Sequence, residues 1–229
     1  ILLSAQAQEA CDAVWDATIT TTDQWPLEDE PHAIARMLEA LDRTLALYPD
    51  GFFRQMKNTM GEGGVRFMPV GHIENAVNAI GLTYETYGWQ NIYIDVTIDA
   101  FDGTICHEIW HAIEGVLLTR NWDAINQEEW AACNPAGFSY NEDAETPDSN
   151  PERWTFFYEF SAQDVYFVDA YSRTNAKEDR ARIMEYIMAT EDVAGALVQS
   201  PAIAQKLQIM CRAIRENFDT SSWGELRWE

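Results

Sequence analysis

The stretch NIYIDVTIDAFDGTICHEIWH, residues 91–111, combines a strand, a turn and the first half of a helix. Residues 92–98 are rich in β-branched side chains that largely alternate with polar ones, which is typical of a strand. Residues 99–104 form a turn that offers N-cap residues to a helix. On that helix His107 and His111 are four residues apart, so both imidazoles project from the same face.

The pentapeptide His107-Glu108-Ile109-Trp110-His111 has the pattern H-E-x-x-H, in which the histidines bind zinc and the glutamate is the general base of a metallopeptidase. The chain has only four histidines, and two of them lie in this one turn. The flanking residues are apolar, which predicts a buried helix whose polar groups need partners. We therefore expect a zinc site with His107 and His111 as ligands and Glu108 as the base.

A catalytic zinc site has three protein ligands and leaves the fourth position to water. No histidine follows His111, and Glu114 and Leu117 stand where the metzincin extension requires Gly and His. The third ligand is therefore expected to be a carboxylate, best placed at the start of a second helix that packs across the first. Several acidic residues after the motif remain open as this ligand: Glu114, Glu142, Glu145, Glu152, Glu159, Asp164, Asp169, Glu178 and Asp179.

The segment YSRTNAKEDRA, residues 171–181, resembles the second signature of the lethal-factor-like zinc metallopeptidases, which include the Pro-Pro endopeptidases. That signature has a tyrosine followed seven positions later by a zinc-binding glutamate, the spacing of Tyr171 and Glu178. The resemblance implies that Glu178 is the third zinc ligand and that Tyr171 faces the reacting carbonyl. Arg182 departs from the pattern, which often has an acidic residue four positions after the ligand.

An ordinary helix start explains the same residues. Asn175 and Glu178 have the spacing of a capping box, in which the glutamate bonds to the backbone rather than to a metal. Asp179 is the main alternative ligand because it lies nearer the apolar face of the next helix, and Glu159 and Glu152 follow it. In the same way, Tyr171 is explained as one of nine tyrosines, placed at a helix end.

The chain is more closely similar to the zinc-binding peptidase domains of bacterial surface and secreted proteins, over about residues 45–190. Residues 48–53, YPDGFF, and 178–181, EDRA, carry part of this likeness. It implies an α+β, mainly helical, zincin-like fold with a small mixed sheet and an active-site helix bearing H-E-x-x-H. It also implies a Zn²⁺ cofactor, a peptide or protein substrate, and a secreted or cell-surface location, with the signal peptide or anchor outside these 229 residues.

The charge of the chain excludes several classes of partner. Lys and Arg number 15 against 38 Asp and Glu, a net charge of −23, which repels nucleic acid and anionic membranes. No apolar stretch approaches the roughly 18 residues of a membrane span. Because 47% of the 229 residues are hydrophobic, the chain can bury a large core, and we expect one domain, residues 1–229, and a monomer.

Periodicity predicts helices at both ends of the chain and a small sheet between them. The expected helices are 2–16, 31–47, 74–80, 103–120, 152–170, 176–190 and 201–217, and the expected strands are 65–70 and 92–98. The four cysteines, Cys11, Cys106, Cys133 and Cys211, have no metal-binding spacing and leave three pairings open. Cys106 is expected in the core, and Cys11 and Cys211 can be joined if the terminal helices pack together.

The principal function expected from these residues is hydrolysis of peptide bonds by a zinc endopeptidase. Hydrolysis of a non-peptide amide uses the same metal chemistry and is a second reading. A third reading is a non-catalytic zinc module, a vestigial peptidase that acts in binding at the cell surface. A structural zinc site is closed by four protein ligands and has no need of Glu108, which favours the catalytic readings.

Overall fold

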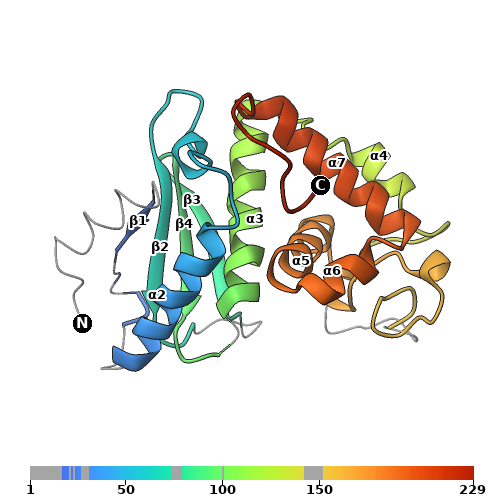
Figure 1. The fold of residues 1–229 in the computed structure, drawn as a ribbon, viewed down its shortest axis with the longest axis horizontal. Helices are drawn as coiled ribbons and strands as arrows, with labels where there is room; N and C mark the ends of the chain where they lie inside the picture. Colours follow the sequence, from blue (N-terminus) through green and yellow to red (C-terminus); the bar gives the residue numbers. More distant parts are fainter. Residues whose placement is uncertain are drawn as a thin grey trace.

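The computed structural model describes residues 17–20, 22, 24–26, 31–73, 79–99, 101–141 and 152–229. Within these ranges the chain forms a four-stranded sheet and six α-helices. The long helix α3 (Phe101–Arg120) stands between the sheet on one side and the C-terminal helices on the other (Figure 1). This arrangement confirms the expected α+β, mainly helical fold with a small mixed sheet.

The sheet has the order β1-β2-β4-β3, in which β1, β2 and β4 are parallel and β3 runs antiparallel to β4 at one edge. Two of its strands, β2 and β4, confirm the two predicted strands, although β4 ends three residues earlier than expected. The other two strands were not predicted. The bounds are Thr18–Ile19 for β1, Gly64–Val70 for β2, Gly81–Thr86 for β3 and Trp89–Asp95 for β4.

A two-residue turn joins β3 to β4. Its central residues, Tyr87 and Gly88, have φ angles of 51° and 82°. Positive φ at both positions is the geometry of a type I′ hairpin turn, for which Asn-Gly or Asp-Gly is the usual sequence signal. Tyrosine is an uncommon residue there, which explains why β3 was missed.

Side chains alternate along each strand between the two faces of the sheet, and each face packs into a different hydrophobic cluster. On one face Phe67, Ile92 and Ile94 join the main core beneath α2 (Pro31–Leu45) and α3. On the other face Met68, Val70 and Ile73 form a small separate cluster, against which Trp25, Leu82 and Tyr93 pack. The two helices therefore lie over the same face of the sheet.

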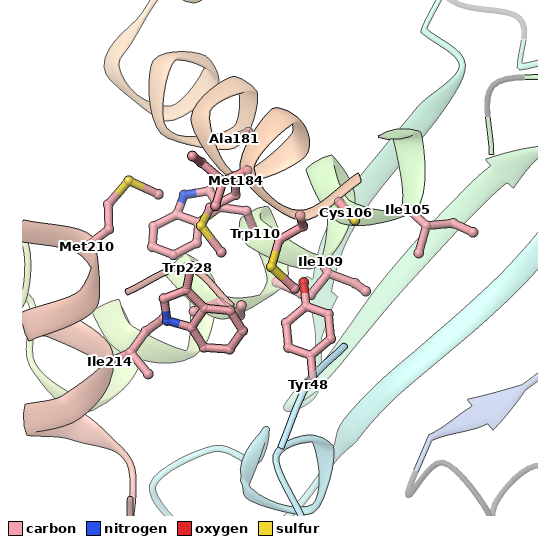
Figure 2. Packing of buried hydrophobic residues seen from close by; sticks show 14 of the residues in the cluster. Tyr48, Ile105, Cys106, Ile109, Trp110, Ala181, Met184, Met210, Ile214 and Trp228 are labelled. Atoms are coloured by element: carbon pink, nitrogen blue, oxygen red, sulfur yellow. The ribbon is translucent and has the colours of Figure 1, made fainter. Parts of the chain in front are cut away.

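The other side of α3 is covered by the C-terminal helices. In Figure 2, Ala181 and Met184 of α5 (Ala176–Ala189) lie beside Trp110 of α3, and Trp228 lies between Trp110 and Ile214 of α7 (Pro201–Asn217). A helix that is apolar on nearly all sides is typically buried on nearly all sides, which is what the flanks of the histidine motif predicted. The C-terminal helices are α4 (Gln127–Ala132), α5 (Ala176–Ala189), α6 (Glu191–Leu197) and α7 (Pro201–Asn217).

Four of the seven expected helices are confirmed, as α2, α3, α5 and α7, with ends within two residues of those predicted. The short helices α4 and α6 were not predicted. The helix expected at 2–16 lies outside the described residues, as do residues 74–78 of the one expected at 74–80. Residues 79 and 80, which are described, are not helical.

The prediction of an α-helix over 152–170 is wrong. Trp154 has a φ of 67°, and Thr155 pairs with Phe167 in an isolated parallel bridge. The backbone carbonyls of Val165 and Tyr166 accept hydrogen bonds from the side chains of Ser200 and Lys206, which lie 35 and 40 positions further along the chain. Aromatic and β-branched residues are weak helix formers, so these tertiary contacts determine the conformation of the segment.

No helix within the described ranges is long and apolar enough to cross a membrane. The main hydrophobic cluster includes residues from Ala17 to Trp228 and draws on the sheet and on helices from both sides of α3. The expectation of a single domain stays a prediction.

Candidate metal centre

Three side chains from two helices converge where α5 crosses α3. His107 Nε2 lies 3.0 Å from Glu178 Oε2 and 3.1 Å from His111 Nε2, and His111 Nε2 lies 3.4 Å from Glu178 Oε2. All three side chains are at least four-fifths buried. Among the described residues this is the group of His, Cys, Asp and Glu whose ligand atoms lie within 4.8 Å of one another.

The spacing of these atoms fits a zinc ion. Tetrahedral ligands at bond lengths of about 2.0–2.1 Å lie about 3.3 Å apart from one another. The three observed separations, 3.0, 3.1 and 3.4 Å, fall around that value. Two imidazole nitrogens and one carboxylate oxygen are also the donor set of many catalytic zinc sites. The residues present therefore fit the metal that the sequence predicts.

The charges around His107 and Glu178 favour a cation at the same point. Burial disfavours the imidazolium, but hydrogen bonds to Glu178 and Glu185 outweigh it and raise the pKa of His107 to about 10. Burial also disfavours ionised Glu178, but hydrogen bonds from His107 and His111 hold its pKa well below the usual range. A site that binds a proton this firmly between carboxylates also attracts a metal cation.

The start of α5 places Glu178 at the centre. Asn175 Oδ1 caps the helix by accepting hydrogen bonds of 3.0 Å from the backbone N–H groups of Lys177 and Glu178. Glu178 Oε2 contacts the imidazoles across the helix crossing. The ordinary capping role thus belongs to Asn175, and the carboxylate of Glu178 is available to the histidines.

Two buried ion pairs fix α5 next to this residue. Asp179 Oδ2 accepts hydrogen bonds of 2.7 Å from Lys206 Nζ of α7 and from Tyr140 Oη. Arg180 binds Glu114 of α3 through two nitrogens, at 2.9 and 2.6 Å. Asp179 and Arg180 thus bind α5 to α7 and to α3. Because these two residues directly follow Glu178, they also determine the position of Glu178 closely.

The same contacts direct the alternative ligands away from the histidines. Asp179 has no exposed surface and faces Lys206, and Glu114 faces Arg180. Glu159 accepts a hydrogen bond from the backbone N–H of Trp154, and Asp169 binds Arg182. Glu152 is exposed, and Glu142 and Glu145 lie outside the described residues. Of the candidates described, the structure brings Glu178 to the imidazoles.

Glu108 lies beside His107, His111 and Glu178, and a residue of the edge strand β3 fixes the position of its carboxyl group. Thr83 of β3 donates a hydrogen bond of 2.7 Å to Glu108 Oε2. A Cβ atom on Gly81 would lie 2.7 Å from Glu108 Cγ and from Oε1, so only glycine leaves room for this carboxyl group. Burial raises the pKa of Glu108, against the opposing effect of His107 and His111. The carboxyl group is therefore positioned as a proton acceptor of increased basicity.

Tyr171 borders the centre from a 3₁₀ turn, Tyr171–Arg173, just before α5. Its ring centroid lies 6.2 Å from that of His107, and its side chain is about half exposed. Burial of the hydroxyl, followed by the neighbouring Glu178 carboxylate, raises the pKa of Tyr171 well above its usual value. The hydroxyl stays protonated and can donate a hydrogen bond at any ordinary pH.

Glu185, which also contacts the centre, was not predicted from the sequence. Its Oε2 lies 3.1 Å from His107 Nδ1, and a carboxylate of this kind accepts the N–H of an imidazole and leaves the other ring nitrogen facing the centre. The resemblance directed attention to position 182, four residues after Glu178, which is Arg182. Position 185 is seven residues after Glu178 and so lies on the same helix face, two turns further on, which was the signal available.

The thiols take no part in this centre. Cys106, Cys133 and Cys211 are free, and Cys106 is fully buried in the core, as expected (Figure 2). Cys11, the other member of the suggested pair with Cys211, lies outside the described residues. Cys106 is not among the residues that surround the possible ion.

Comparison with known proteins gives a likeness of fold. No protein-family model matches the chain, and no curated protein matches it. The fold is similar to a crystal structure from Bacteroides caccae described as a "putative zinc-binding metallo-peptidase", with a TM-score of 0.52 over 97% of this chain and 89% of that one. The two sequences are 12% identical, so the likeness concerns the fold. The chain therefore shares the overall fold of that structure.

Proposed function

We propose that this protein is a zinc-dependent endopeptidase that hydrolyses peptide bonds. The observation that carries the proposal is the convergence of His107, His111 and Glu178 at ligand spacing, with Glu108 buried beside them. The likeness to the Bacteroides caccae structure supports the same class of protein through its fold. In this proposal the three converging residues bind Zn²⁺ and Glu108 is the general base.

Zinc bound there would lower the pKa of a water molecule to about 7 and polarise the scissile carbonyl. Glu108 then accepts the proton of the attacking water on its carboxylate and passes it to the leaving amine nitrogen. Burial, which raises the pKa of Glu108, makes it a better base for this transfer. Thr83 keeps the carboxylate in place through both steps by its hydrogen bond to Oε2.

In the same proposal, Tyr171 is the oxyanion donor. Its hydroxyl remains protonated because burial and the Glu178 carboxylate disfavour the phenolate. A single such donor is typically worth about 3 kcal/mol of transition-state stabilisation. Its half-exposed position beside His107 leaves it accessible to a substrate carbonyl.

The edge strand β3 supports a peptide as the substrate. It pairs with β4 on one side, and no strand of the described part of the chain pairs with its other side. Exposed strand edges bind extended peptides through backbone hydrogen bonds. Thr83 is on β3 and contacts Glu108 directly, so a peptide added to this edge would run past the general base.

The structure weighs against a purely structural zinc site. Such a site is closed by four protein ligands, whereas three ligand side chains meet in the described part of the chain. Glu108, which a structural site does not need, is buried with a hydrogen bond that orients it. Zinc held by these three side chains would leave one coordination position to water, and this, together with the oriented base, favours hydrolysis.

Metal analysis combined with cleavage of a peptide library tests this function. The purified protein should contain about one zinc ion per chain, and it should cleave library peptides in a manner that a chelator abolishes and added zinc restores. Stoichiometric zinc without cleavage of any peptide would favour the non-catalytic zinc module. Protein that binds no zinc would overturn the proposal entirely.

Replacing Glu178 with alanine is expected to weaken zinc binding by at least about tenfold, because even an outer-shell partner of a zinc ligand contributes about 10- to 100-fold to affinity. Competition with a chromogenic chelator measures the dissociation constant. Glu152→Ala is the matched control, since Glu152 is an exposed glutamate outside α5 and should bind no metal. Equal zinc affinity in the two variants would remove Glu178 from the ligand set.

Replacing Gly81 with alanine is expected to reduce hydrolysis by about tenfold or more while zinc stays bound. The added Cβ would lie 2.7 Å from Glu108 and 2.8 Å from Thr104 Cγ2, so the base must move from its place, and small misplacements of catalytic groups are costly. Initial rates and zinc content should be measured together. Gly224→Ala is the control, since nothing lies within 4 Å of its added Cβ. An unchanged rate in Gly81→Ala would show that the position of Glu108 does not limit catalysis.

A further inference from the structure

Arg182 connects two parts of the centre that are separate in sequence. Its Nη1 donates to Glu185 Oε2, the same oxygen that lies 3.1 Å from His107 Nδ1. Its Nε donates at 3.0 Å to Asp169 Oδ2, and Nη2 contacts the same oxygen. The Arg182 side chain is about four-fifths buried, and both carboxylates are at least three-quarters buried. One guanidinium thus binds two carboxylates, one of which contacts His107 and the other Ser172.

Glu185 forms the arm that leads to the zinc ligands. Glu185 is placed to orient His107, because its oxygen accepts the Nδ1–H and leaves Nε2 facing Glu178. Helix α3 permits this close approach at Gly103, where an added Cβ would lie 3.0 Å from Glu185 Oε1. Arg182 binds the same oxygen of Glu185 that His107 contacts, and this second contact restricts the rotamer of Glu185.

Asp169 forms the arm that leads to Tyr171. Asp169 Oδ1 accepts hydrogen bonds from the backbone N–H of Ser172 at 3.1 Å and from its hydroxyl at 3.2 Å. Ser172 is fully buried and is the middle residue of the 3₁₀ turn that begins at Tyr171. By fixing Asp169, Arg182 therefore also fixes the 3₁₀ turn that carries Tyr171.

We propose that Arg182 is a positioning residue that locks the zinc-ligand imidazole of His107 and the Tyr171 turn into one unit, through Glu185 and Asp169 respectively. This inference rests on the proposed zinc peptidase function. Arginine suits the role because its planar fork has donors in fixed directions and binds two acceptors at once. A lysine offers one point charge and cannot bridge both carboxylates in the same way.

A double-mutant cycle on zinc affinity tests the first arm. Arg182→Met and Glu185→Gln are each expected to weaken zinc binding by about 10- to 100-fold, as outer-shell changes do. The double variant should bind zinc about as weakly as Glu185→Gln alone, because Arg182 acts through Glu185. Arg182→Lys should lie between the wild type and Arg182→Met. Fold-losses that multiply in the double variant would contradict this coupling.

Catalytic constants test the second arm. With zinc saturating, Arg182→Met should lower kcat further than Glu185→Gln does, with little change in KM, and Tyr171→Phe should cost less in the Arg182→Met protein than in the wild type. Full additivity of Arg182→Met and Tyr171→Phe would contradict the link through Asp169. Melting temperatures without zinc separate a folding defect from a positioning defect.

Arg215→Met is the matched control, because Arg215 also binds a carboxylate, that of Glu229, and lies on α7 outside the centre. It should leave zinc affinity and kcat unchanged. Wild-type protein that binds no zinc would overturn both this inference and the proposed function. Wild-type protein that binds zinc, with an unchanged dissociation constant in Arg182→Met, would overturn this inference alone.

Discussion

Glu108→Gln is expected to lower kcat/KM for peptide hydrolysis by about 10²- to 10⁴-fold, the usual contribution of a general base, while zinc stays bound. Glutamine has nearly the same shape as glutamate, so it fits beside Gly81 and can still accept the hydrogen bond from Thr83. Its amide cannot accept the proton of the attacking water. Rates on the best library peptide and zinc content per chain measure the two properties separately.

The control for this variant is Glu128→Gln, the same chemical change at an exposed residue in the first turn of α4. It should leave both the rate and the zinc content unaltered. Undiminished hydrolysis in Glu108→Gln would exclude Glu108 as the base and with it the proposed mechanism. Loss of zinc in this variant would instead show that Glu108 contributes to the metal site itself.

Lys206→Met is expected to lower the free energy of unfolding by about 3–5 kcal/mol, the usual cost of removing one partner from a buried ion pair. Lys206 and Asp179 have no exposed surface, and their side chains lie 2.7 Å apart. The substitution leaves the Asp179 carboxylate buried with Tyr140 as its remaining hydrogen-bond donor, and it removes the donor to the carbonyl of Tyr166. Equilibrium urea denaturation at constant pH measures the loss.

Two further variants make this test specific. Lys177→Met, at an exposed lysine of α5, should change the free energy of unfolding by less than about 0.5 kcal/mol. Adding Asp179→Asn to Lys206→Met removes the uncompensated charge but keeps an acceptor for Tyr140, so the double variant should be more stable than Lys206→Met alone. If the double variant is instead less stable, the cost does not come from the unpaired carboxylate.

The helices whose apolar faces repeat clearly could be predicted from sequence, and those that depend on distant partners could not. The segments that became α2, α5 and α7 carry start signals or periodic apolar residues, and their bounds came out within two residues. The helix predicted over residues 152–170 is absent because carbonyls in that segment accept hydrogen bonds from Ser200 and Lys206, which lie far along the chain. The strand β3 was not predicted because its turn has Tyr87 at a positive φ, which no sequence rule anticipates.

The site shows the same division between local pattern and distant contact. His107 and His111 could be paired from their spacing alone, because an α-helix places residues i and i+4 on one face. The choice between Glu178 and Asp179 required the fold, since adjacent residues on a helix point about 100° apart and only packing determines which of them faces α3. Thr83 and Gly81, which orient Glu108, come from a strand that the sequence did not reveal.

By itself the sequence determined the histidine pair, its neighbouring glutamate, the buried character of their helix and the mixed α+β class, because each depends on local periodicity or composition. Only the tertiary structure decided that Glu178 meets the imidazoles, that Glu185 rather than residue 182 contacts His107, and that Arg182 bridges Glu185 to Asp169. Those contacts join residues up to 78 positions apart, for His107 and Glu185. They exist because α5 is held across α3 by buried ion pairs on both sides, and the strength of such pairs depends on burial that no local pattern encodes.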